Sequence, residues 1–249
     1  MSPSKPHLSI ILPAYNEAER IPATLLDIDK RMAGKEYAYE IIVVNDGSKD
    51  NTSEVVKKLM PAVKNLKLLD NVENKGKGGV VRQGMLAATG DIRLFMDSDN
   101  ATTIDHFDQM EQFFREGYHV VICSRAMKGS KLDPPEPWYR QIPGKLGNLF
   151  WIQPLLLWGL WDTQCGFKAF TAECAEKVFS FSKLSGWSFD AEILALAMAM
   201  GFRVKEVPVH WKHDGQSKVK ASAYIQVLLD VAKIRWWFIT DAYRLKQVK

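Results

Sequence analysis

Two aspartates separated by one residue follow an apolar run in the first half of the chain. The run is Ile92–Met96, and Asp97 and Asp99 come directly after it, on either side of Ser98. Carboxylate oxygens at this spacing suit Mg²⁺ or Mn²⁺, and such a cation can bridge the two phosphates of a diphosphate. A polar turn or a helix cap is the alternative interpretation, because aspartate is common after strands. The pair alone does not decide between them.

Two earlier apolar runs end in residues that suit a nucleotide. The ring of Tyr15 offers a flat surface for a base, Asp46 can accept hydrogen bonds from a base or a ribose, and Gly47 permits a close turn. The alternative at the second run is a plain turn in which Ser48 or Asp50 caps the next helix. The residues that follow the two runs are Pro13, Ala14, Tyr15, Asn16 and Glu17, and then Asn45, Asp46, Gly47 and Ser48.

A glycine-rich turn, Gly76–Gly79, precedes the aspartates. It has neither the spacing of a Walker motif nor that of the dinucleotide-binding fingerprint. Its backbone could approach a phosphate, with Lys75 or Lys77 beside it. On its own the turn is a weak signal.

Strands and helices alternate through the first half of the chain, and this predicts an α/β fold. Alternation with apolar strands is typical of a mostly parallel sheet with helices on both faces. Such sheets bind ligands at the carboxyl ends of their strands, which is where the polar residues above lie. The predicted strands are Leu8–Leu12, Glu40–Val44, Leu66–Leu69, Ile92–Met96 and His119–Cys123, and the predicted helices are Asn16–Met32, Thr52–Met60, Gly79–Ala88 and Ile104–Glu116.

The alternation stops after Ser124. Residues 126–147 are rich in proline, glycine and charge, and are predicted to form a long loop. No repeat and no linker divides the chain, so a single domain over residues 1–249 is predicted. The remaining predictions are an interrupted apolar segment at Leu149–Trp161, helices at Thr171–Phe179 and Phe189–Met200, a strand at Arg203–Trp211 and a helix at Tyr224–Arg244.

Composition and charge exclude several classes of protein. The chain is 47% hydrophobic and 25% charged, as globular proteins are, and its net charge of +4 is too small for a protein that coats nucleic acid. Three cysteines are too few for a disulfide framework or a structural zinc site. The first residues lack the pattern of a signal peptide, and no stretch reaches the ~20 apolar residues of a membrane span. A cytoplasmic location is therefore predicted.

Taken together, these motifs resemble those of the family 2 glycosyltransferases, which have the Rossmann-like GT-A fold. Three runs in the second half resemble the polyprenyl-phosphate sugar synthases: Asp162–Lys168, Trp187–Glu192 and Gly215–Lys218. The first of these is most similar to the dolichyl-phosphate β-glucosyltransferases. The resemblance implies a metal-dependent, inverting transfer of glucose from UDP-glucose to a polyprenyl phosphate. It also implies a nucleotide-sugar-binding half at residues 1–125 and an acceptor half at residues 126–249.

The resemblance implies a role for individual residues. Asp97 and Asp99 would bind Mg²⁺ or Mn²⁺, and Lys218 would reach the diphosphate. Asp190 would face the sugar as a catalytic residue, together with Arg125 and Lys218. The implied nucleotide contacts are Pro13, Ala14, Tyr15, Glu17, Asp46, Gly47, Lys75, Asp97 and Ser98, and the implied contacts to the acceptor phosphate are Arg125, Lys128 and Arg140.

The sequence departs from the family pattern around the two aspartates. Ser98 replaces a commoner alanine, which changes little because neither residue is a required ligand. Residues 100–102 occupy the stretch where related mannosyl synthases have a glutamine that completes the metal shell. The third protein ligand therefore stays open, and glucose is favoured over the alternative, mannose from GDP-mannose.

A phosphate acceptor and a hydroxyl acceptor make different demands on the protein. A phosphate monoester has a second pKa of about 6, so near neutral pH it is largely dianionic and needs positive charge rather than a strong base. Arginine suits that task because it forks onto phosphate. Two alternatives stay open: transfer to a soluble hydroxyl acceptor with Asp190 as base, and a sugar-nucleotide-binding module without catalytic activity.

Two apolar segments suggest attachment to the cytoplasmic face of a membrane. Residues 146–161 contain Trp151, Trp158 and Trp161 but are too short and interrupted to span a bilayer. In the predicted C-terminal helix, Trp236 and Trp237 follow Arg235, as in an aromatic anchor at headgroup level. Peripheral membrane binding is the favoured interpretation. Packing on the same domain, or across a homodimer, is the alternative.

Overall fold

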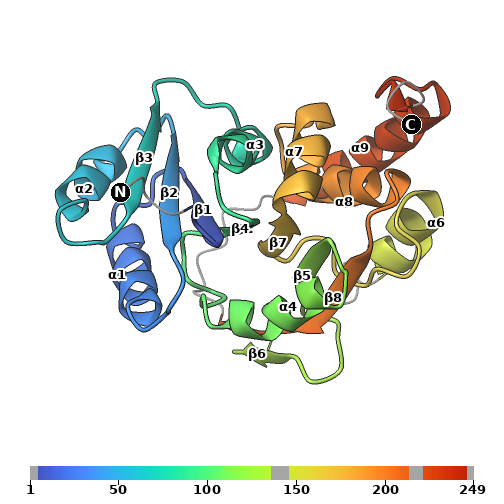
Figure 1. Ribbon diagram of the computed structural model, residues 1–249. Coiled ribbons are helices and arrows are strands. Elements are labelled where there is room, and N and C mark those ends of the chain that lie inside the picture. Colours follow the sequence, from blue (N-terminus) through green and yellow to red (C-terminus); the bar gives the residue numbers. More distant parts are fainter. Residues whose placement is uncertain (1–4, 136–145, 213–220, 246–249) are drawn as a thin grey trace.

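The computed structural model describes residues 5–135, 146–212 and 221–245, and side chains at 221–224 are excluded. Its centre is a seven-stranded sheet in the order β3-β2-β1-β4-β7-β5-β8 (Figure 1). All neighbouring strands pair in parallel except β7, which runs antiparallel to β4 and β5, so the predicted mostly parallel sheet is confirmed. The strands are β1 (Leu8–Ala14), β2 (Tyr39–Asp46), β3 (Leu66–Asn71), β4 (Ile92–Met96), β5 (Val120–Ser124), β7 (Phe167–Thr171) and β8 (Val204–Pro208).

Helices cover both faces of this sheet. On one face lie α1 (Ile21–Met32), α2 (Thr52–Leu59) and α4 (His106–Arg115). On the other lie α3 (Lys77–Ala87), α7 (Ala172–Phe181), α8 (Phe189–Ala199) and α9 (Ala221–Ile239), and Figure 1 shows α3, α7 and α8 side by side. The helical turn η1 (Asn148–Ile152) and the short helix α6 (Gln153–Leu155) lie beside α9.

The central strands are continuous apolar runs because both of their faces are buried. In β1, Ile10 and Leu12 pack with the α1 side, while Ile11 packs with the α3 side. Every residue of β1 is buried, and its partner β2 is buried along its whole length. This packing fixes the carboxyl ends of β1, β2 and β4 at one edge of the sheet.

The structure differs from the predicted elements in several places, and among them α9 ends at Ile239 rather than at Arg244. Strand β7 was not predicted, and it comes from the second half of the chain but lies between β4 and β5. The predicted strand Arg203–Trp211 is divided at Pro208 into β8 and a short β9 (His210–Lys212), which pairs with β6 (Lys131–Asp133) inside the predicted loop. Helix α1 begins at Ile21 rather than Asn16, because Asn16 has a left-handed backbone with φ of 53°.

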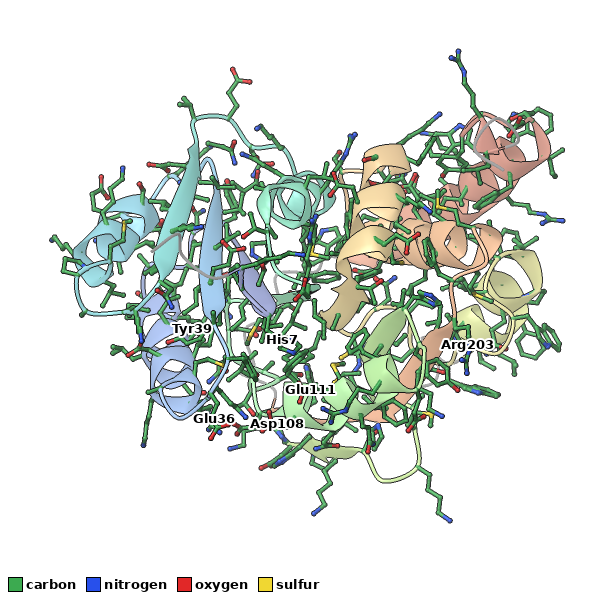
Figure 2. The ribbon with its side chains drawn as sticks, viewed as in Figure 1. His7, Glu36, Tyr39, Asp108, Glu111 and Arg203 are labelled. Atoms are coloured by element: carbon green, nitrogen blue, oxygen red, sulfur yellow. The ribbon has the colours of Figure 1, made fainter. Side chains whose placement is uncertain are left out.

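The amino-terminal edge of the sheet is held by charged side chains. His7 Nε2 lies 3.1 Å from Glu111 Oε1 of α4, and both are labelled in Figure 2. Glu40 of β2 is buried and accepts hydrogen bonds from Ser9 of β1 at 2.6 Å, from Thr89 before β4 and from Lys67 of β3. These contacts join four chain segments at the edge opposite the predicted site.

Candidate active site

The loops that follow β1 and β2 are bound to each other. The backbone N–H of Asn16 donates to Ser48 Oγ at 2.9 Å, and the N–H of Lys49 donates to Asn16 Oδ1 at 2.8 Å. The N–H of Glu17 donates to Thr52 Oγ1 at 2.9 Å. Short polar side chains thus satisfy the backbone groups that the strands leave unpaired. The two predicted nucleotide-binding loops form one unit.

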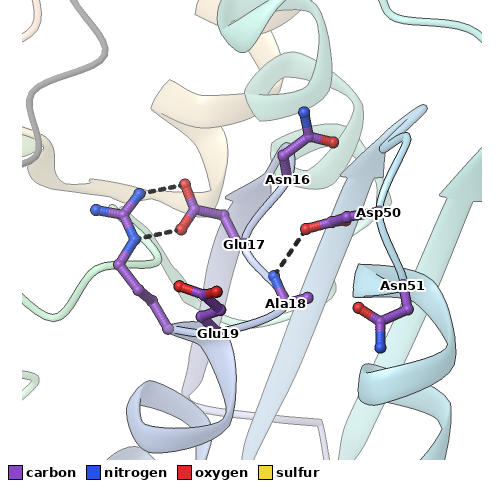
Figure 3. Close-up of a pocket in the computed structure, with 7 residues that line it drawn as sticks. Asn16, Glu17, Ala18, Glu19, Asp50 and Asn51 are labelled. Carbon is purple, nitrogen blue, oxygen red and sulfur yellow. Dashed lines mark hydrogen bonds and ion pairs between the residues drawn. The ribbon is translucent and has the colours of Figure 1, made fainter.

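A pocket of about 270 Å³ opens beside these loops (Figure 3). Inside it Glu17 and Arg20 form a two-point ion pair, with Arg20 Nη2 2.6 Å from Glu17 Oε1. The pocket therefore contains the predicted nucleotide contact Glu17, whereas Asp46, Asp97 and Asp99 do not line it. Its lining residues are Asn16, Glu17, Ala18, Glu19, Arg20, Asp50 and Asn51.

Asp46 organises the loop between β3 and α3. Its carboxylate accepts from the backbone N–H of Lys75 at 2.6 Å and from Asn74 Nδ2 at 3.0 Å. Burial raises the pKa of Asp46, although these donors oppose the rise. The adjacent Gly47 has a φ of 64°, and a β-carbon there would meet the Glu73 backbone at 2.8 Å. Lys75 itself is exposed, and its ammonium binds Asn71 at 2.7 Å.

Asp97 and Asp99 follow β4 in a turn that other elements support. The N–H of Asp97 donates to the carbonyl of Gly166 at 3.1 Å, and Thr24 Oγ1 of α1 donates to the carbonyl of Ser98 at 2.7 Å. A β-carbon at Gly166 would overlap the Asp97 carboxylate, so a larger residue there would displace that carboxylate. Burial and the neighbouring Asp97 carboxylate raise the pKa of Asp99.

These two carboxylates fit a divalent cation that is shared with a diphosphate. Both offer hard oxygens. Burial and the Asp97 carboxylate raise the pKa of Asp99, and a nearby cation would favour its ionised form. Asn100 donates to Asp27 of α1 at 3.1 Å, which turns its amide toward that helix. Within the described ranges no cluster of three or more His, Cys, Asp or Glu side chains could hold a metal. A bound diphosphate could supply further oxygens to a cation at Asp97 and Asp99.

Lys77, at the start of α3, supplies positive charge to the same turn. Its Nζ lies 2.6 Å from Asp97 Oδ1 and 5.2 Å from the centre of the Trp187 ring. Burial alone would lower the pKa of Lys77, but the carboxylates of Asp97, Asp190 and Asp99 raise it overall. The glycines beside Lys77 allow close packing, because a β-carbon on Gly78 would meet Phe189 Cβ at 2.6 Å.

Asp190 lies at the first turn of α8 and is 2% exposed. It accepts a hydrogen bond from Lys168 of β7, which has no exposed surface. Burial raises the pKa of Asp190, while the ammonium groups of Lys168 and Lys77 oppose that rise. The predicted sugar-facing carboxylate is therefore half of a buried ion pair, close to Lys77.

Arg125 follows β5 and is held by Asp162. Its Nε lies 2.7 Å from Asp162 Oδ2 and its Nη2 lies 3.0 Å from Asp162 Oδ1, a two-point geometry that fixes the guanidinium plane. Burial would raise the pKa of Asp162, but attraction to Arg125 lowers it to about 2. The Arg125 guanidinium also lies 5.6 Å from the centre of the Trp211 ring.

The other predicted contacts to the acceptor phosphate and the diphosphate are Lys128, Arg140 and Lys218. Lys128 is exposed between β5 and β6. Arg140 and Lys218 lie outside the described residues. The structure adds Lys168, Asp162 and Gly166, for which the sequence predicts no individual role. Their partners are distant in sequence, so no local pattern identifies these contacts.

Comparisons with known proteins agree with this fold. The model of glycosyl transferase family 2 matches residues 9–179. The chain therefore belongs to glycosyl transferase family 2 and is a glycosyltransferase, as the motifs predicted.

Similar proteins include several dolichyl-phosphate beta-glucosyltransferases. That of Trichomonas vaginalis named ALG5C is 36% identical, over 98% of this chain and 75% of the relative. That of Dictyostelium discoideum is 35% identical, over 96% and 77%. The human protein is 32% identical, over 100% and 80%.

Solved structures share the GT-A fold. One is glucosyl-3-phosphoglycerate synthase from Mycobacterium tuberculosis in complex with Mn²⁺, uridine diphosphate and glucosyl-3-phosphoglycerate. It has a TM-score of 0.67 at 17% identity, covering 92% of this chain and 80% of that one. Mannosyl-3-phosphoglycerate synthase from Rubrobacter xylanophilus has a TM-score of 0.66 at 15% identity, covering 98% and 77%.

Proposed function

We propose that this glycosyltransferase moves glucose from UDP-glucose to a polyprenyl phosphate of the dolichyl type, with inversion at the anomeric carbon. The names of the relatives support this sugar and this acceptor. The observation that carries the proposal is the segment from Asp162 to Gly166. Asp162 binds Arg125 at one end of it, and Gly166 accepts from the N–H of Asp97 at the other. A guanidinium suited to an acceptor phosphate, and a carboxylate suited to the cation that would bind the donor diphosphate, are thereby joined by one short segment of chain.

At the donor end, Asp97 and Asp99 would coordinate Mg²⁺ or Mn²⁺ together with the diphosphate. The Mn²⁺ in the solved complex of similar fold supports a divalent cation. When bound, the cation would neutralise charge on the leaving nucleotide. Lys77 and, by the family resemblance, Lys218 would add positive charge. The proposed nucleotide contacts are Pro13, Ala14, Tyr15, Glu17, Asp46, Gly47, Lys75, Asp97 and Ser98.

At the acceptor end, Arg125 would bind the lipid phosphate, assisted by Lys128 and Arg140. A phosphate dianion can attack the anomeric carbon without giving up a proton, so this acceptor needs no general base. The ion pair between Asp190 and Lys168 supports an acceptor that needs no general base, because this carboxylate is bound to an ammonium rather than free to take a proton. Asp190 would then stabilise the positive charge that develops on the sugar.

Peripheral attachment to the cytoplasmic face of a membrane belongs to the same proposal. None of the described helices is long and apolar enough to cross a bilayer. Exposed apolar side chains gather on η1, on the turn after α6 and on α9, and Trp151 Nε1 of η1 donates to the carbonyl of Leu228 of α9 at 2.9 Å. We call this set the apolar patch: Leu149, Phe150, Trp151, Trp158, Trp161, Ile225, Leu228, Leu229, Trp236 and Ile239.

Helix α9 turns one charged side chain inward and exposes both apolar and basic side chains. Asp230 is buried and accepts from Ser188 Oγ at 2.6 Å, beside the buried Val231 and Ile234. Lys233 and Arg235 are exposed on the same helix. Basic residues next to exposed aromatic and aliphatic side chains suit a surface of anionic lipid.

A parallel assay of two donors tests the proposed function. Purified protein is incubated with Mg²⁺ or Mn²⁺, a short polyprenyl phosphate, and either UDP-glucose or GDP-mannose, and products are identified by mass spectrometry. Glucosyl phosphopolyprenol is expected, and it should be lost in Asp99→Asn. A mannosyl product would overturn the sugar and keep the acceptor. Nucleotide binding with no lipid product from either donor would contradict the proposal.

A further inference from the structure

A fully buried lysine lies beneath the candidate active site. Lys168 of β7 has no exposed surface, and its ammonium donates to Asp190 and to the carbonyl of Cys165 at 2.6 Å. The same ammonium lies 5.3 Å from the centre of the Phe95 ring. Burying a lysine removes its hydration, and a buried ion pair seldom stabilises a fold more than apolar residues of similar volume would. The burial of Lys168 therefore indicates a role in function rather than in stability alone.

Basic and acidic side chains alternate from β7 toward the turn that contains Asp97 and Asp99. Lys168 pairs with Asp190, Lys77 is attracted to both Asp190 and Asp97, and Lys77 Nζ lies 2.6 Å from Asp97 Oδ1. Asp190 thus binds the ammonium of Lys168 on β7 and is attracted to the ammonium of Lys77 on α3. A carboxylate buried in this way keeps its negative charge only while a cation neutralises it.

We propose that Lys168 is a positioning residue of the transfer reaction, whose ammonium fixes the ionised Asp190 carboxylate beside Lys77 and Asp97, where the transferred sugar would lie. This inference rests on the proposed function and deepens its account of Asp190. Lys168 is rigid on a central strand, so the direction of the Asp190 carboxylate is set before substrate binds. Preorganised charge of this kind favours the transition state over the ground state, so its loss lowers kcat more than it raises KM.

A double-mutant cycle tests this role. The variants are Lys168→Met, Asp190→Asn and the two combined, each assayed for kcat and for the KM of the donor. Each single change is expected to lower kcat about 10²-fold, because the carboxylate is then misplaced or absent. The donor KM should stay within about threefold, and the double variant should be no slower than Asp190→Asn alone.

Lys205→Met is the matched control. Lys205 also lies on a strand, β8, with its ammonium 5.2 Å from the centre of the Phe113 ring, but it has no place in the proposed site. Its substitution should leave kcat unchanged. Lys168→Met leaves a buried carboxylate without its ammonium, so circular dichroism checks folding. The double variant, which removes both charges, is the arm least affected by that imbalance.

Three results would overturn the inference. One is a folded double variant with kcat close to that of the unaltered protein. Another is a double variant whose loss is the product of the two single losses, since Lys168 would then act independently of Asp190. The third is Asp190→Asn with unaltered kcat, which would leave the assigned donor and acceptor intact. The unaltered protein is the reference in every assay. If it transfers no sugar, the proposed function is wrong. If it is active, the variants test the role of Lys168 alone.

Discussion

Three acidic side chains of the candidate site each have a basic partner. Asp97 is paired with Lys77, Asp190 with Lys168, and Asp162 with Arg125. The pairs lie at the ends of β4 and β5, at the start of α8 and in the segment before β7. Because charges that are already oriented need not reorganise during a reaction, such pairs favour the transfer of a sugar from one anionic group to another.

The Asp162 carboxylate is expected to act through Arg125. Asp162→Asn keeps the shape of the side chain but removes the charge that fixes the guanidinium by two contacts. The KM for polyprenyl phosphate should rise about tenfold while the KM for UDP-glucose changes little. Steady-state kinetics with each substrate varied in turn measures both. Glu173→Gln, which loses a pairing with the exposed Lys177 on α7, is the control. Equal KM values for the acceptor in Asp162→Asn and the unaltered protein would contradict this role.

Gly166 is expected to be essential for the metal site. In Gly166→Ala the new methyl group would overlap the Asp97 carboxylate and push it from its position. Titration of Mn²⁺ followed by electron paramagnetic resonance should show affinity reduced by about tenfold or more, as for the loss of one ligand interaction. Gly34→Ala is the control, since nothing lies within 4 Å of the added β-carbon. Unchanged Mn²⁺ affinity in a folded Gly166→Ala protein would show that Asp97 is not a ligand.

At the scale of elements, the apolar strands of the first half of the chain were predictable, whereas β7 was not. Strands β1, β2 and β4 are continuous apolar runs, and such runs indicate strands that are buried on both faces. Strand β2 extends past its apolar run because Asn45 and Asp46 continue the pairing with β3. Strand β7 was missed because Lys168 interrupts its apolar pattern, and that lysine is tolerated only through Asp190, which lies 22 residues away.

In the candidate site, too, some features follow from local sequence and others depend on contacts between distant residues. The aspartates after β4 and the polar loops after β1 and β2 were predictable, because parallel strands bring their carboxyl ends to one edge. The pairing of Arg125 with Asp162 joins residues 37 apart, and the fit of Gly166 against Asp97 depends on the antiparallel alignment of β4 and β7. Such contacts depend on tertiary structure, which spacing along the chain does not encode.

The edge of the sheet opposite the site should make stability depend on pH. Burial would raise the pKa of Glu40, but hydrogen bonds from Lys67, Ser9 and Thr89 lower it from 4.5 to about 2. A carboxyl with a lowered pKa in the folded state stabilises the fold above its unfolded value and loses that effect as pH falls toward 2. Glu40→Gln is therefore expected to be less stable by about 2 kcal/mol at pH 7.

Denaturant unfolding of both proteins from pH 7 to pH 3 measures this dependence. The difference in unfolding free energy should be constant above about pH 5 and should shrink as the pH falls below 4.5. Glu54→Gln, an exposed change on α2, serves as the control. A difference that stays constant down to pH 3 would contradict the lowered pKa of Glu40.

At the scale of the whole molecule, the apolar patch is expected to bind membranes. Phe150 and Trp158 are 69% and 78% exposed, and burying such side chains in lipid contributes about 2 kcal/mol each. Replacing both with serine should weaken sedimentation with phosphatidylcholine vesicles that contain phosphatidylserine by about tenfold or more.

The control for vesicle binding is Val72→Ser. Val72 is 96% exposed, but it lies between β3 and α3, away from the patch. Its substitution should leave binding to vesicles unchanged. If the patch variant sediments as the unaltered protein does but loses a dimer in analytical ultracentrifugation, the patch is a subunit interface and the membrane proposal is wrong.

A comparison of two lipids tests most directly whether the acceptor is a phosphate. The protein is supplied with UDP-glucose, the divalent cation, and either a polyprenyl phosphate or the polyprenol of the same length, and glucosylated lipid is measured by mass spectrometry. Product is expected from the polyprenyl phosphate alone, because Arg125 is oriented for an anion and Asp190 is held in an ion pair rather than free to take a proton. Glucosylation of the polyprenol at a comparable rate would contradict it, since the site would then activate a hydroxyl and Asp190 would act as a base.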